Sequence, residues 1–377
     1  MSLIKILSFI SIILFSCTQK PVKNKTVPPT IFSPYTIDTV SMSSILKYKI
    51  DTFFEHRLKK SKLSGQFLFA EKNHVYLNSF GKSRTETSKD IQNDDVFQIA
   101  SVSKFITAIC ILKLVELKKL VLTDSVKKYL PQFNYSSITI YQLLTHTSGL
   151  PEYHYLSDSA WANDSSIKTI ADAFELLNMR HKEAYYAPGS RFNYCNSNYM
   201  LLAHIAEKIT SWSFAKIVDT FIAKPLGLKY LHVYQPNKKK LLDYNVCGLR
   251  GNQTYIPDDC LNQISGDKSI FTNVYDLFLV QRALIDKKII SAKYLKLILA
   301  PQVQYKFVNP QFYSFGLRQV RLENGEKWHF HNGWWHGFRT YFWFNIEKEK
   351  TVILFTNRLK GGFFNTQEMI GLLENSH

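Results

Sequence analysis

A serine and a lysine three positions apart are the first residues in this chain that point to chemistry. Ser101 and Lys104 lie in the segment IASVSK, directly before apolar residues that recur at helical spacing. Residues i and i+3 share one helix face, so the Lys104 amine can reach the Ser101 hydroxyl and take its proton. At the start of a helix, the backbone N–H of Ser101 can also face a developing oxyanion. The pair predicts a nucleophile and its base.

A tyrosine and an asparagine form a second set. Tyr194 and Asn196 follow the polar segment APGSRFN and precede a predicted helix. A phenol near a lysine can return a proton to a leaving group, and the Asn196 amide can orient both the substrate and Lys104. The alternative is a loop tyrosine that only caps the helix beginning near Ser197.

The third set is the segment HNGW, at the end of a predicted strand. His331 offers a donor for a substrate carboxylate or amide, and Gly333 leaves room for a substrate backbone at the sheet edge. The N–H of Trp334 would complete an oxyanion hole with that of Ser101. A zinc site built from His329, His331 and His336 is the competing hypothesis, but no acidic residue lies near them in the sequence. Zinc is therefore disfavoured.

Together the three sets resemble, in order and rough spacing, the serine β-lactamase and penicillin-binding-protein superfamily, in its class C β-lactamase-like, D,D-carboxypeptidase and esterase branch. The resemblance extends over residues 45–373 and includes the segments FQIASVSKFIT, LLTHTSGLP, YAPGSRFNYCNSNY, KPLGL, GDKSIFTNVYDL and HNGWWHG. It implies an α/β (α+β) fold: an antiparallel sheet flanked by helices, with an inserted helical subdomain. It also implies acyl transfer with Ser101, Lys104 and Tyr194 as catalytic residues, and substrate binding by Asn196, His331, Gly333 and Trp334. By the same resemblance, no metal or other cofactor is expected. Whether Lys104 or Tyr194 accepts the first proton stays open.

Two departures from the superfamily pattern bear on the substrate. His331 begins a His-Asn-Gly segment where many β-lactamases have Lys-Thr-Gly, and Cys195 stands where serine is common. We therefore expect D,D-peptidase-like or esterase-like hydrolysis of peptidoglycan fragments, D-amino-acid peptides or small esters, rather than efficient β-lactam hydrolysis. A β-lactamase and a non-catalytic penicillin- or peptidoglycan-binding sensor module are the alternatives. An α/β-hydrolase is disfavoured because the chain has no Gly-x-Ser-x-Gly segment.

Hydrophobic periodicity indicates the elements that must position these residues. Helices are predicted over 43–60, from Ser101 onward, and over 138–144, 166–177, 197–209 and 214–221, with a terminal helix from Asn365. Strands are predicted over 65–70, 74–80, 313–321, 327–331, 340–344 and 351–356. We expect both chain ends to share one antiparallel sheet, about 43–100 and 265–377, with a helical part over about 101–264.

The N-terminal residues predict export. Lys5 precedes an apolar run that is short for a permanent membrane helix, which is typical of a signal peptide over residues 1–16. The run ends at Cys17 in a segment that resembles a bacterial lipoprotein box. Residues 17–42 then form a lipidated N-terminus and a proline-containing linker, followed by the hydrolase domain over 43–377. We expect a lipid anchor in the bacterial cell envelope, with the domain in the periplasm or at the cell surface. The sequence does not indicate whether the anchor lies in the inner or the outer membrane.

Charge and cysteine content limit the other possibilities. The formal net charge is +17, but the one dense basic run is residues 238–240, so we expect no nucleic-acid partner. Besides Cys17 the chain has Cys110, Cys195, Cys247 and Cys260, with no Cys-x-x-Cys spacing. Cys247 with Cys260 is the one pair considered for a disulfide, and the sequence leaves that question open.

Overall fold

The computed structural model describes residues 35–358, apart from short gaps at 38–39, 42–43, 62–63, 85–88, 136, 162–165, 180–182, 241–242, 252 and 308–309. The predicted signal peptide, Cys17, most of the predicted linker and the terminal helix expected from Asn365 lie outside the described residues. Among the residues that are described, no helix is both long and apolar enough to cross a membrane.

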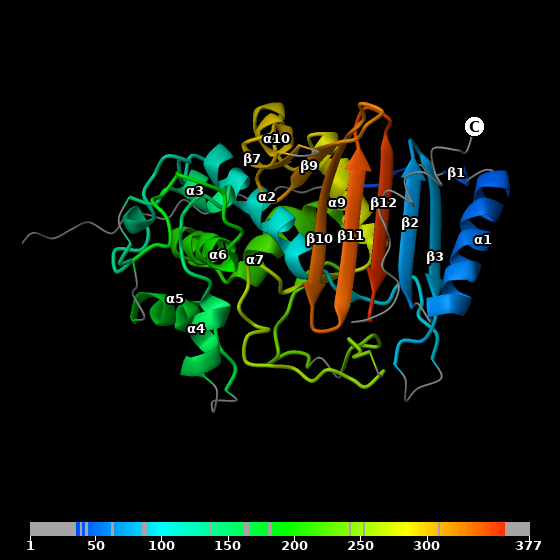
Figure 1. Cartoon of the computed structure of the whole chain (residues 1–377), viewed down its shortest axis with the longest axis horizontal. Coiled ribbons are helices and arrows are strands. Elements are labelled where there is room, and N and C mark those ends of the chain that lie inside the picture. Colours follow the sequence, from blue (N-terminus) through cyan, green and yellow to red (C-terminus); the bar gives the residue numbers. More distant parts are fainter. Residues whose placement is uncertain are drawn as a thin grey trace, which may run out of the picture. The chain divides into compact units, whose positions relative to one another are not determined.

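The main sheet joins the two ends of the described chain (Figure 1). Its strand order is β1-β3-β2-β12-β11-β10-β9-β8-β7, and neighbours run antiparallel except β1 and β3, which are parallel. The strands are β1 (Val40–Ser41), β2 (Gly65–Glu71), β3 (His74–Phe80), β7 (Val303–Lys306), β8 (Gln311–Tyr313), β9 (Arg318–Arg321), β10 (Lys327–Trp335), β11 (Phe338–Asn345) and β12 (Lys350–Thr356). Because β12 pairs with β2, the prediction that both ends share one sheet is confirmed.

Helices pack against both faces of this sheet, with one described helix in the core on the second face. Side chains alternate along a strand, so Phe342 and Phe344 of β11 face one core, while Tyr341 and Trp343 face the other. The first core holds α2 (Ser103–Glu116) and α9 (Val274–Ile285), and the second includes Ile50 of α1 (Ser44–Ser61). The sheet is therefore the middle layer of three.

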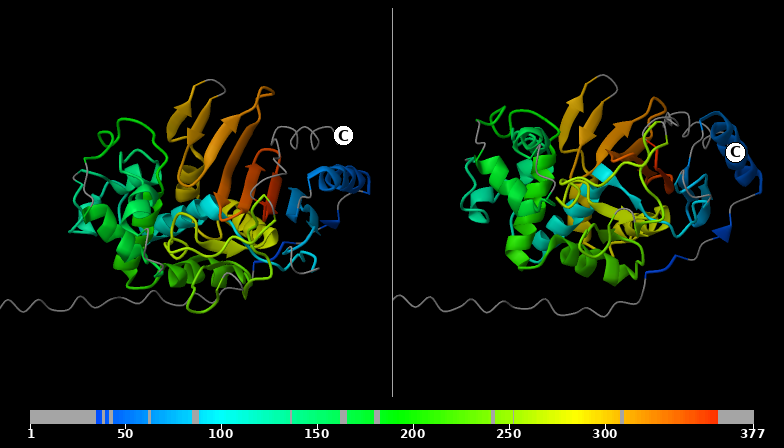
Figure 2. Two further views of the ribbon diagram at one scale, coloured as in Figure 1. Left: turned by 60° about the horizontal axis from the view of Figure 1, so that its bottom comes forward. Right: turned by 90° about the horizontal axis from the view of Figure 1, so that it is seen from below.

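The remaining helices gather on the other side of α2 (Figure 2). They are α3 (Ile140–Leu144), α4 (Tyr153–Ala160), α5 (Ile170–Met179), α6 (Asn196–Thr210), α7 (Phe214–Val218) and α8 (Lys224–Leu226), while α10 (Ala292–Leu299) precedes β7. A small sheet of β4 (Phe97–Gln98), β6 (Ile270–Thr272) and β5 (His232–Val233) lies beside them in that order. Since α2 packs on α6 and α7 as well as on the main sheet, it connects the two regions. The predicted fold class is confirmed.

Some predicted boundaries are wrong. The single strand predicted over 313–321 is two strands, β8 and β9, separated by a turn at Gly316, whose φ is +74°. A Cβ on Gly316 would lie 2.5 Å from the Lys104 carbonyl oxygen, so the turn is needed where the sheet meets α2. The helix predicted over 166–177 starts later and forms α5. Cys247 and Cys260 are free thiols, as are Cys110 and Cys195.

Candidate active site

Ser101 lies in a sharp turn that leads into α2. It is the middle residue of a short 3-10 helix, Ala100–Val102, and the preceding Ala100 has a φ of +47°. Such a backbone is strained for a residue with a Cβ, so the surrounding structure must hold it. Thr340 of β11 does so in part, because its hydroxyl donates to the Ile99 carbonyl at 2.9 Å. The predicted nucleophile is thus fixed to the main sheet.

Lys104 is completely buried and its Nζ is surrounded by oxygens. The Nζ lies 3.3 Å from Ser101 Oγ, 2.6 Å from Asn196 Oδ1 and 3.0 Å from the Asp267 carbonyl oxygen. All three acceptors are neutral, and together they match the three donors of an ammonium group. The structure therefore brings together the serine and lysine predicted from spacing, together with Asn196.

Tyr194 lies against the same lysine. Its ring centroid is 5.0 Å from Lys104 Nζ, and the ring also contacts the His146 ring, with 4.4 Å between centroids. The Tyr194 hydroxyl is buried and has no hydrogen-bond partner among the described residues. A buried hydroxyl without a partner is unusual, because it has lost water without replacing it.

Asn196 is oriented by a mostly buried carboxylate that was not predicted from the sequence. Asn196 begins α6, and its backbone N and Nδ2 donate to Glu152 Oε2 at 2.7 and 3.0 Å. This contact fixes the amide so that its oxygen faces Lys104. Burial raises the pKa of Glu152, and the negative charge of Asp267 adds to the rise.

The residues of the third predicted set all lie on β10, but in two different environments. His331 is only 1% exposed, with its Nδ1 2.9 Å from the Asn332 carbonyl oxygen and its Nε2 3.4 Å from the Tyr313 hydroxyl. Burial lowers the pKa of His331 well below its usual value, and the positive charges of Arg318 and Lys104 lower it further. The imidazole is therefore neutral at pH 7 and lies in a buried cluster of rings.

Gly333 and Trp334 lie next to the Ser101 turn. A Cβ on Gly333 would be 2.3 Å from Thr340 Oγ1 and 2.4 Å from the Ile99 carbonyl oxygen, so the close packing of the chain itself requires glycine here. The Trp334 side chain is 64% exposed and lines the pocket at Ser101. β10 thus passes directly beside the residues that precede the nucleophile.

The three histidines considered for zinc have separate environments. His329 stacks on Phe344 with 5.2 Å between ring centroids, whereas His336 Nε2 lies 2.7 Å from Asp259 Oδ2. The acidic partner of His336 comes from a loop that sequence proximity did not reveal. In the described part of the chain, no three His, Cys, Asp or Glu residues are grouped so that they could hold a metal ion.

A pocket of about 390 Å³ opens beside Ser101. Its lining includes three residues predicted from the sequence, which are Ser101, Asn196 and Trp334. The other lining residues were not predicted as site residues: His154, Ile256, Asp267, Lys268, Trp335, His336 and Gly337. The pocket therefore has a second wall, which touches Lys104 through the Asp267 carbonyl oxygen.

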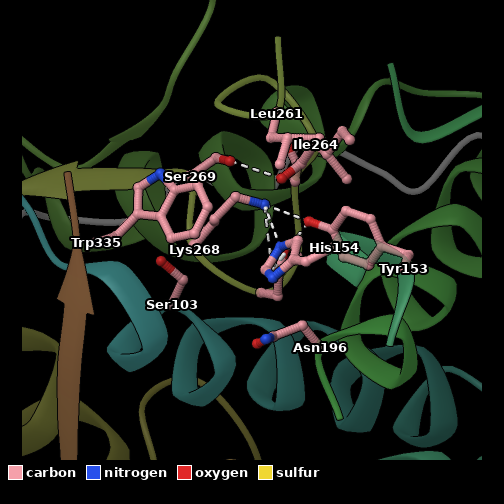
Figure 3. A network of polar contacts seen from close by, with 12 residues as sticks. Ser103, Tyr153, His154, Asn196, Leu261, Ile264, Lys268, Ser269 and Trp335 are labelled. Carbon is pink, nitrogen blue, oxygen red and sulfur yellow. Dashed lines mark hydrogen bonds and ion pairs between the residues drawn. The ribbon is translucent and has the colours of Figure 1, made fainter. Parts of the chain in front are cut away.

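Lys268 is the centre of that second wall (Figure 3). It is 2% exposed, and its Nζ contacts the Tyr153 hydroxyl, Asp267 Oδ2 at 3.3 Å and His154 Nε2 at 3.3 Å. The Nζ also lies 4.9 Å from the centroid of the Trp335 ring. Burial lowers the pKa of Lys268, while the charge of Asp267 opposes this shift.

His154 in this wall is neutral. Burial and the positive charges of Lys268 and Lys104 lower its pKa to about 2. Sequence spacing could not group these residues, because Tyr153 and His154 precede Lys268 by more than a hundred positions. One signal was available: Asp267 and Lys268 are adjacent charges in the segment 264–271, whose other residues are all uncharged.

Comparisons with known proteins identify the class. Residues 50–373 match the Beta-lactamase family model, and the chain belongs to this family, as the sequence analysis predicted. The family is one of serine acyltransferases and hydrolases, and the chain is an enzyme of that general class.

Individual relatives agree with this assignment. The chain is 30% identical over 325 residues to penicillin-binding protein 4* of Bacillus subtilis (strain 168), covering 82% of this chain and 71% of that protein. The octameric penicillin-binding protein homologue from Pyrococcus abyssi superposes with a TM-score of 0.75 at 25% identity, over 87% of this chain and 77% of that one. The D-amino acid amidase from Ochrobactrum anthropi SV3 has the same fold, with a TM-score of 0.74 at 19% identity over 88% of this chain and 99% of that one.

Proposed function

We propose that this protein hydrolyses amide or ester bonds through an acyl-enzyme on Ser101, as a D,D-peptidase-like or esterase-like hydrolase. One observation carries the proposal: Lys104 Nζ lies 3.3 Å from Ser101 Oγ, and Ser101 lines an open pocket. A serine next to a buried lysine is an activated nucleophile, and the pocket gives a substrate carbonyl access to it.

The proposed reaction has two halves. In the first, Ser101 Oγ bonds to the substrate carbonyl carbon while its proton passes to Lys104 or Tyr194. The oxyanion faces the N–H groups of Ser101 and Trp334, and the leaving group departs with the transferred proton. In the second half, water adds to the acyl ester and gives a proton to the same base. The Ser101 oxygen then leaves and takes that proton back.

The hydrogen bonds support different catalytic roles for Lys104 and Tyr194. Lys104 Nζ already has three oxygen acceptors, whereas the buried Tyr194 hydroxyl has none. We therefore assign to Lys104 the positioning of Ser101 and the acceptance of its proton, and to Tyr194 the donation of its phenolic proton to the leaving group. The proton held by Lys104 then restores the Tyr194 phenol.

The state of His331 supports a substrate other than a typical β-lactam. A buried, neutral imidazole does not supply the fixed positive charge that the lysine of a Lys-Thr-Gly segment gives to a substrate carboxylate. We accordingly place peptides, amides or small esters ahead of β-lactams as substrates.

Covalent labelling tests this proposal. The purified protein is treated separately with a fluorophosphonate and a fluorescent penicillin, and the modified residue is located by mass spectrometry. We expect the fluorophosphonate to modify Ser101 in the wild type and to find no target in Ser101→Ala. Ser103→Ala is the matched control, since it removes a neighbouring serine hydroxyl and should leave Ser101 labelled. If neither reagent modifies Ser101, the proposal is wrong.

The penicillin distinguishes the alternatives. Slow release of a penicilloyl group from Ser101 indicates a D,D-peptidase-like pocket, and rapid release indicates a β-lactamase. A stable penicilloyl group without turnover of any ester or amide indicates a sensor module.

We also propose that Cys17 carries a lipid that anchors the protein in the cell envelope. The support is the sequence of residues 1–17 alone. Cells grown with a radioactive fatty acid should yield labelled wild-type protein and unlabelled Cys17→Ser protein. Wild-type protein without label contradicts the anchor.

A further inference from the structure

Two buried imidazoles adjoin the ring of Tyr194, and the backbone fixes the tautomer of the first. His146 lies with its ring centroid 4.4 Å from that of Tyr194, and its Nδ1 lies 3.1 Å from the backbone N of Cys195. A backbone N–H can only donate, so Nδ1 accepts and the proton of the neutral ring is on Nε2. Burial lowers the pKa of His146 well below its usual value, which agrees with a neutral ring.

His331 has the opposite tautomer. Its ring centroid lies 6.1 Å from that of Tyr194, and its Nδ1 lies 2.9 Å from the Asn332 carbonyl oxygen. A carbonyl oxygen can only accept, so the proton of the neutral His331 ring is on Nδ1 and its Nε2 is an acceptor. The ring therefore has no second N–H to donate to another group.

The Tyr313 hydroxyl joins the two imidazoles. Its oxygen lies 3.1 Å from Nε2 of His146 and 3.4 Å from Nε2 of His331. Because His146 donates from Nε2 and His331 accepts at Nε2, the Tyr313 oxygen accepts from the first ring and its proton goes to the second. The two ends of this chain of hydrogen bonds, the Cys195 N–H and the Asn332 carbonyl, thus set the direction of every bond between them.

This chain of hydrogen bonds accounts for the unpaired hydroxyl of Tyr194. Both nitrogens of each imidazole are already occupied, so neither ring offers the phenol an acceptor. The two cations near the Tyr194 ring, Lys104 and Arg318, are donors. The buried hydroxyl accordingly has no partner among the described residues. A phenol whose proton is not bound elsewhere can deliver that proton to a leaving group.

We infer that Tyr313 is a positioning residue: by donating to Nε2 of His331, it prevents this nitrogen from accepting the Tyr194 proton, which stays available for the leaving group. Tyr313 is fully buried, so it acts through His331 and not on the substrate. The inference rests on the proposed function, because only cleavage at Ser101 produces a leaving group that needs the proton. The tautomers of the two imidazoles do not depend on it.

Nitrogen NMR of the imidazoles tests the tautomers without any substrate. The purified protein is prepared with isotopically labelled histidine and measured at neutral pH. We expect the protonated nitrogen to be Nε2 in His146 and Nδ1 in His331, and His146→Gln and His331→Gln assign the two sets of signals. A proton on Nε2 of His331, or on both nitrogens of either ring, overturns the inference.

Tyr313→Phe tests the catalytic consequence. The variant keeps the buried ring and frees Nε2 of His331 to accept from Tyr194. An anilide and a para-nitrophenyl ester of one acyl group are compared, because an aniline needs a proton in order to leave and para-nitrophenolate does not. We expect kcat/KM for the anilide, relative to that for the ester, to fall by about tenfold, which is less than complete loss of a general acid would give. A general loss of activity cancels in this ratio.

Tyr141→Phe is the matched control, because it removes a phenol hydroxyl that bonds to Gln302 at 3.3 Å, and it should keep the ratio. An unchanged ratio in Tyr313→Phe overturns the inference and leaves the hydrolase intact. If that variant does not fold, the NMR of the wild type decides alone. If the wild type cleaves neither substrate and no fluorophosphonate attaches to Ser101, the proposed function fails, and the catalytic role of Tyr313 fails with it.

Discussion

Two buried lysines both contact Asp267 in the wall of the pocket, and their other partners differ. Lys104, on α2, is held by three neutral oxygens, from Ser101, Asn196 and the backbone at Asp267. Lys268, in the loop before β6, is held by the Asp267 carboxylate as well as by Tyr153 and His154. One lysine therefore lies among dipoles and the other in an ion pair.

This difference indicates separate roles for the two lysines. A lysine among neutral oxygens can lose and regain a proton without leaving an unpaired carboxylate behind, which is what a base requires. A lysine paired with a buried carboxylate is expensive to neutralise, so it suits a structural and binding role. Losing Lys104 should thus mainly reduce activity, and losing Lys268 should mainly reduce stability.

The largest effect is expected at Lys104. Lys104→Met should lower the rate of fluorophosphonate labelling of Ser101 by about 10²–10⁴-fold, the usual contribution of a general base. Its stability loss should be smaller than that of Lys268→Met, because only neutral partners are left behind. Labelling kinetics and urea unfolding check both statements. Labelling at the wild-type rate would remove Lys104 from the base role.

Lys268→Met should mainly lower the free energy of unfolding. It leaves Asp267 as a buried, unpaired charge, for which a loss of about 3–5 kcal/mol in the free energy of unfolding is typical. Adding Asp267→Asn should recover much of that loss, as measured by urea unfolding. Lys224→Met is the control, since its ion pair with Asp219 is exposed and worth about 0–1 kcal/mol. Equal stability of the single and double variants would contradict the ion-pair role.

Tyr194→Phe tests the catalytic role proposed for the Tyr194 hydroxyl, which lies near Lys104. The variant keeps the ring that packs against Lys104 and His146 and removes a hydroxyl with no partner. We expect hydrolysis of an unactivated amide to slow by about 10²-fold while the melting temperature stays unchanged or rises. Loss of stability without loss of activity would show that the hydroxyl is structural.

Counted per histidine and per pH unit, the smallest effect is expected in the pH dependence of stability. Burial lowers the pKa of His154 to about 2 and that of His146 and His331 well below 6.5. Below about pH 6.5 the unfolded chain binds protons that the folded chain does not, so stability falls by about 1.4 kcal/mol per pH unit for each such histidine. The raised pKa of Glu152 acts in the opposite direction as the pH falls toward 4.5.

Histidine variants near each of the two lysines test this pH effect. His154→Gln removes a histidine beside Lys268, and His331→Gln removes one on the Lys104 side. Each should reduce the slope of stability against pH between pH 6.5 and 5, as measured by urea unfolding at several pH values. A slope unchanged in both variants would mean that other groups control the acid response.

The sequence predicted the part of the site that depends on local spacing. Ser101 and Lys104 are separated by one helical turn, and their contact needs nothing beyond a helix that starts there. The strands of β2, β3, β11 and β12 were likewise predictable, because their apolar residues form compact runs bounded by polar turns.

The second wall could not be predicted in the same way. The Tyr153–Lys268 contact joins residues from distant loops and depends on how α4 packs relative to the small sheet. The orientation of His331 is another example: its position on a strand was predicted, but its burial against Tyr313 depends on β8, which was merged with β9. Tertiary packing, rather than local propensity, decides both.

The position of β12 has a consequence for how the protein folds. This strand, the last one described, lies between β2 from the start of the domain and β11. Until residues 350–356 are present, the main sheet consists of two separate pieces, each with an unpaired edge. Pairing across nearly the whole domain is slow, because a long loop must close first. During synthesis, β2 and β3 therefore lack their partner strand β12 until residues 350–356 have been made.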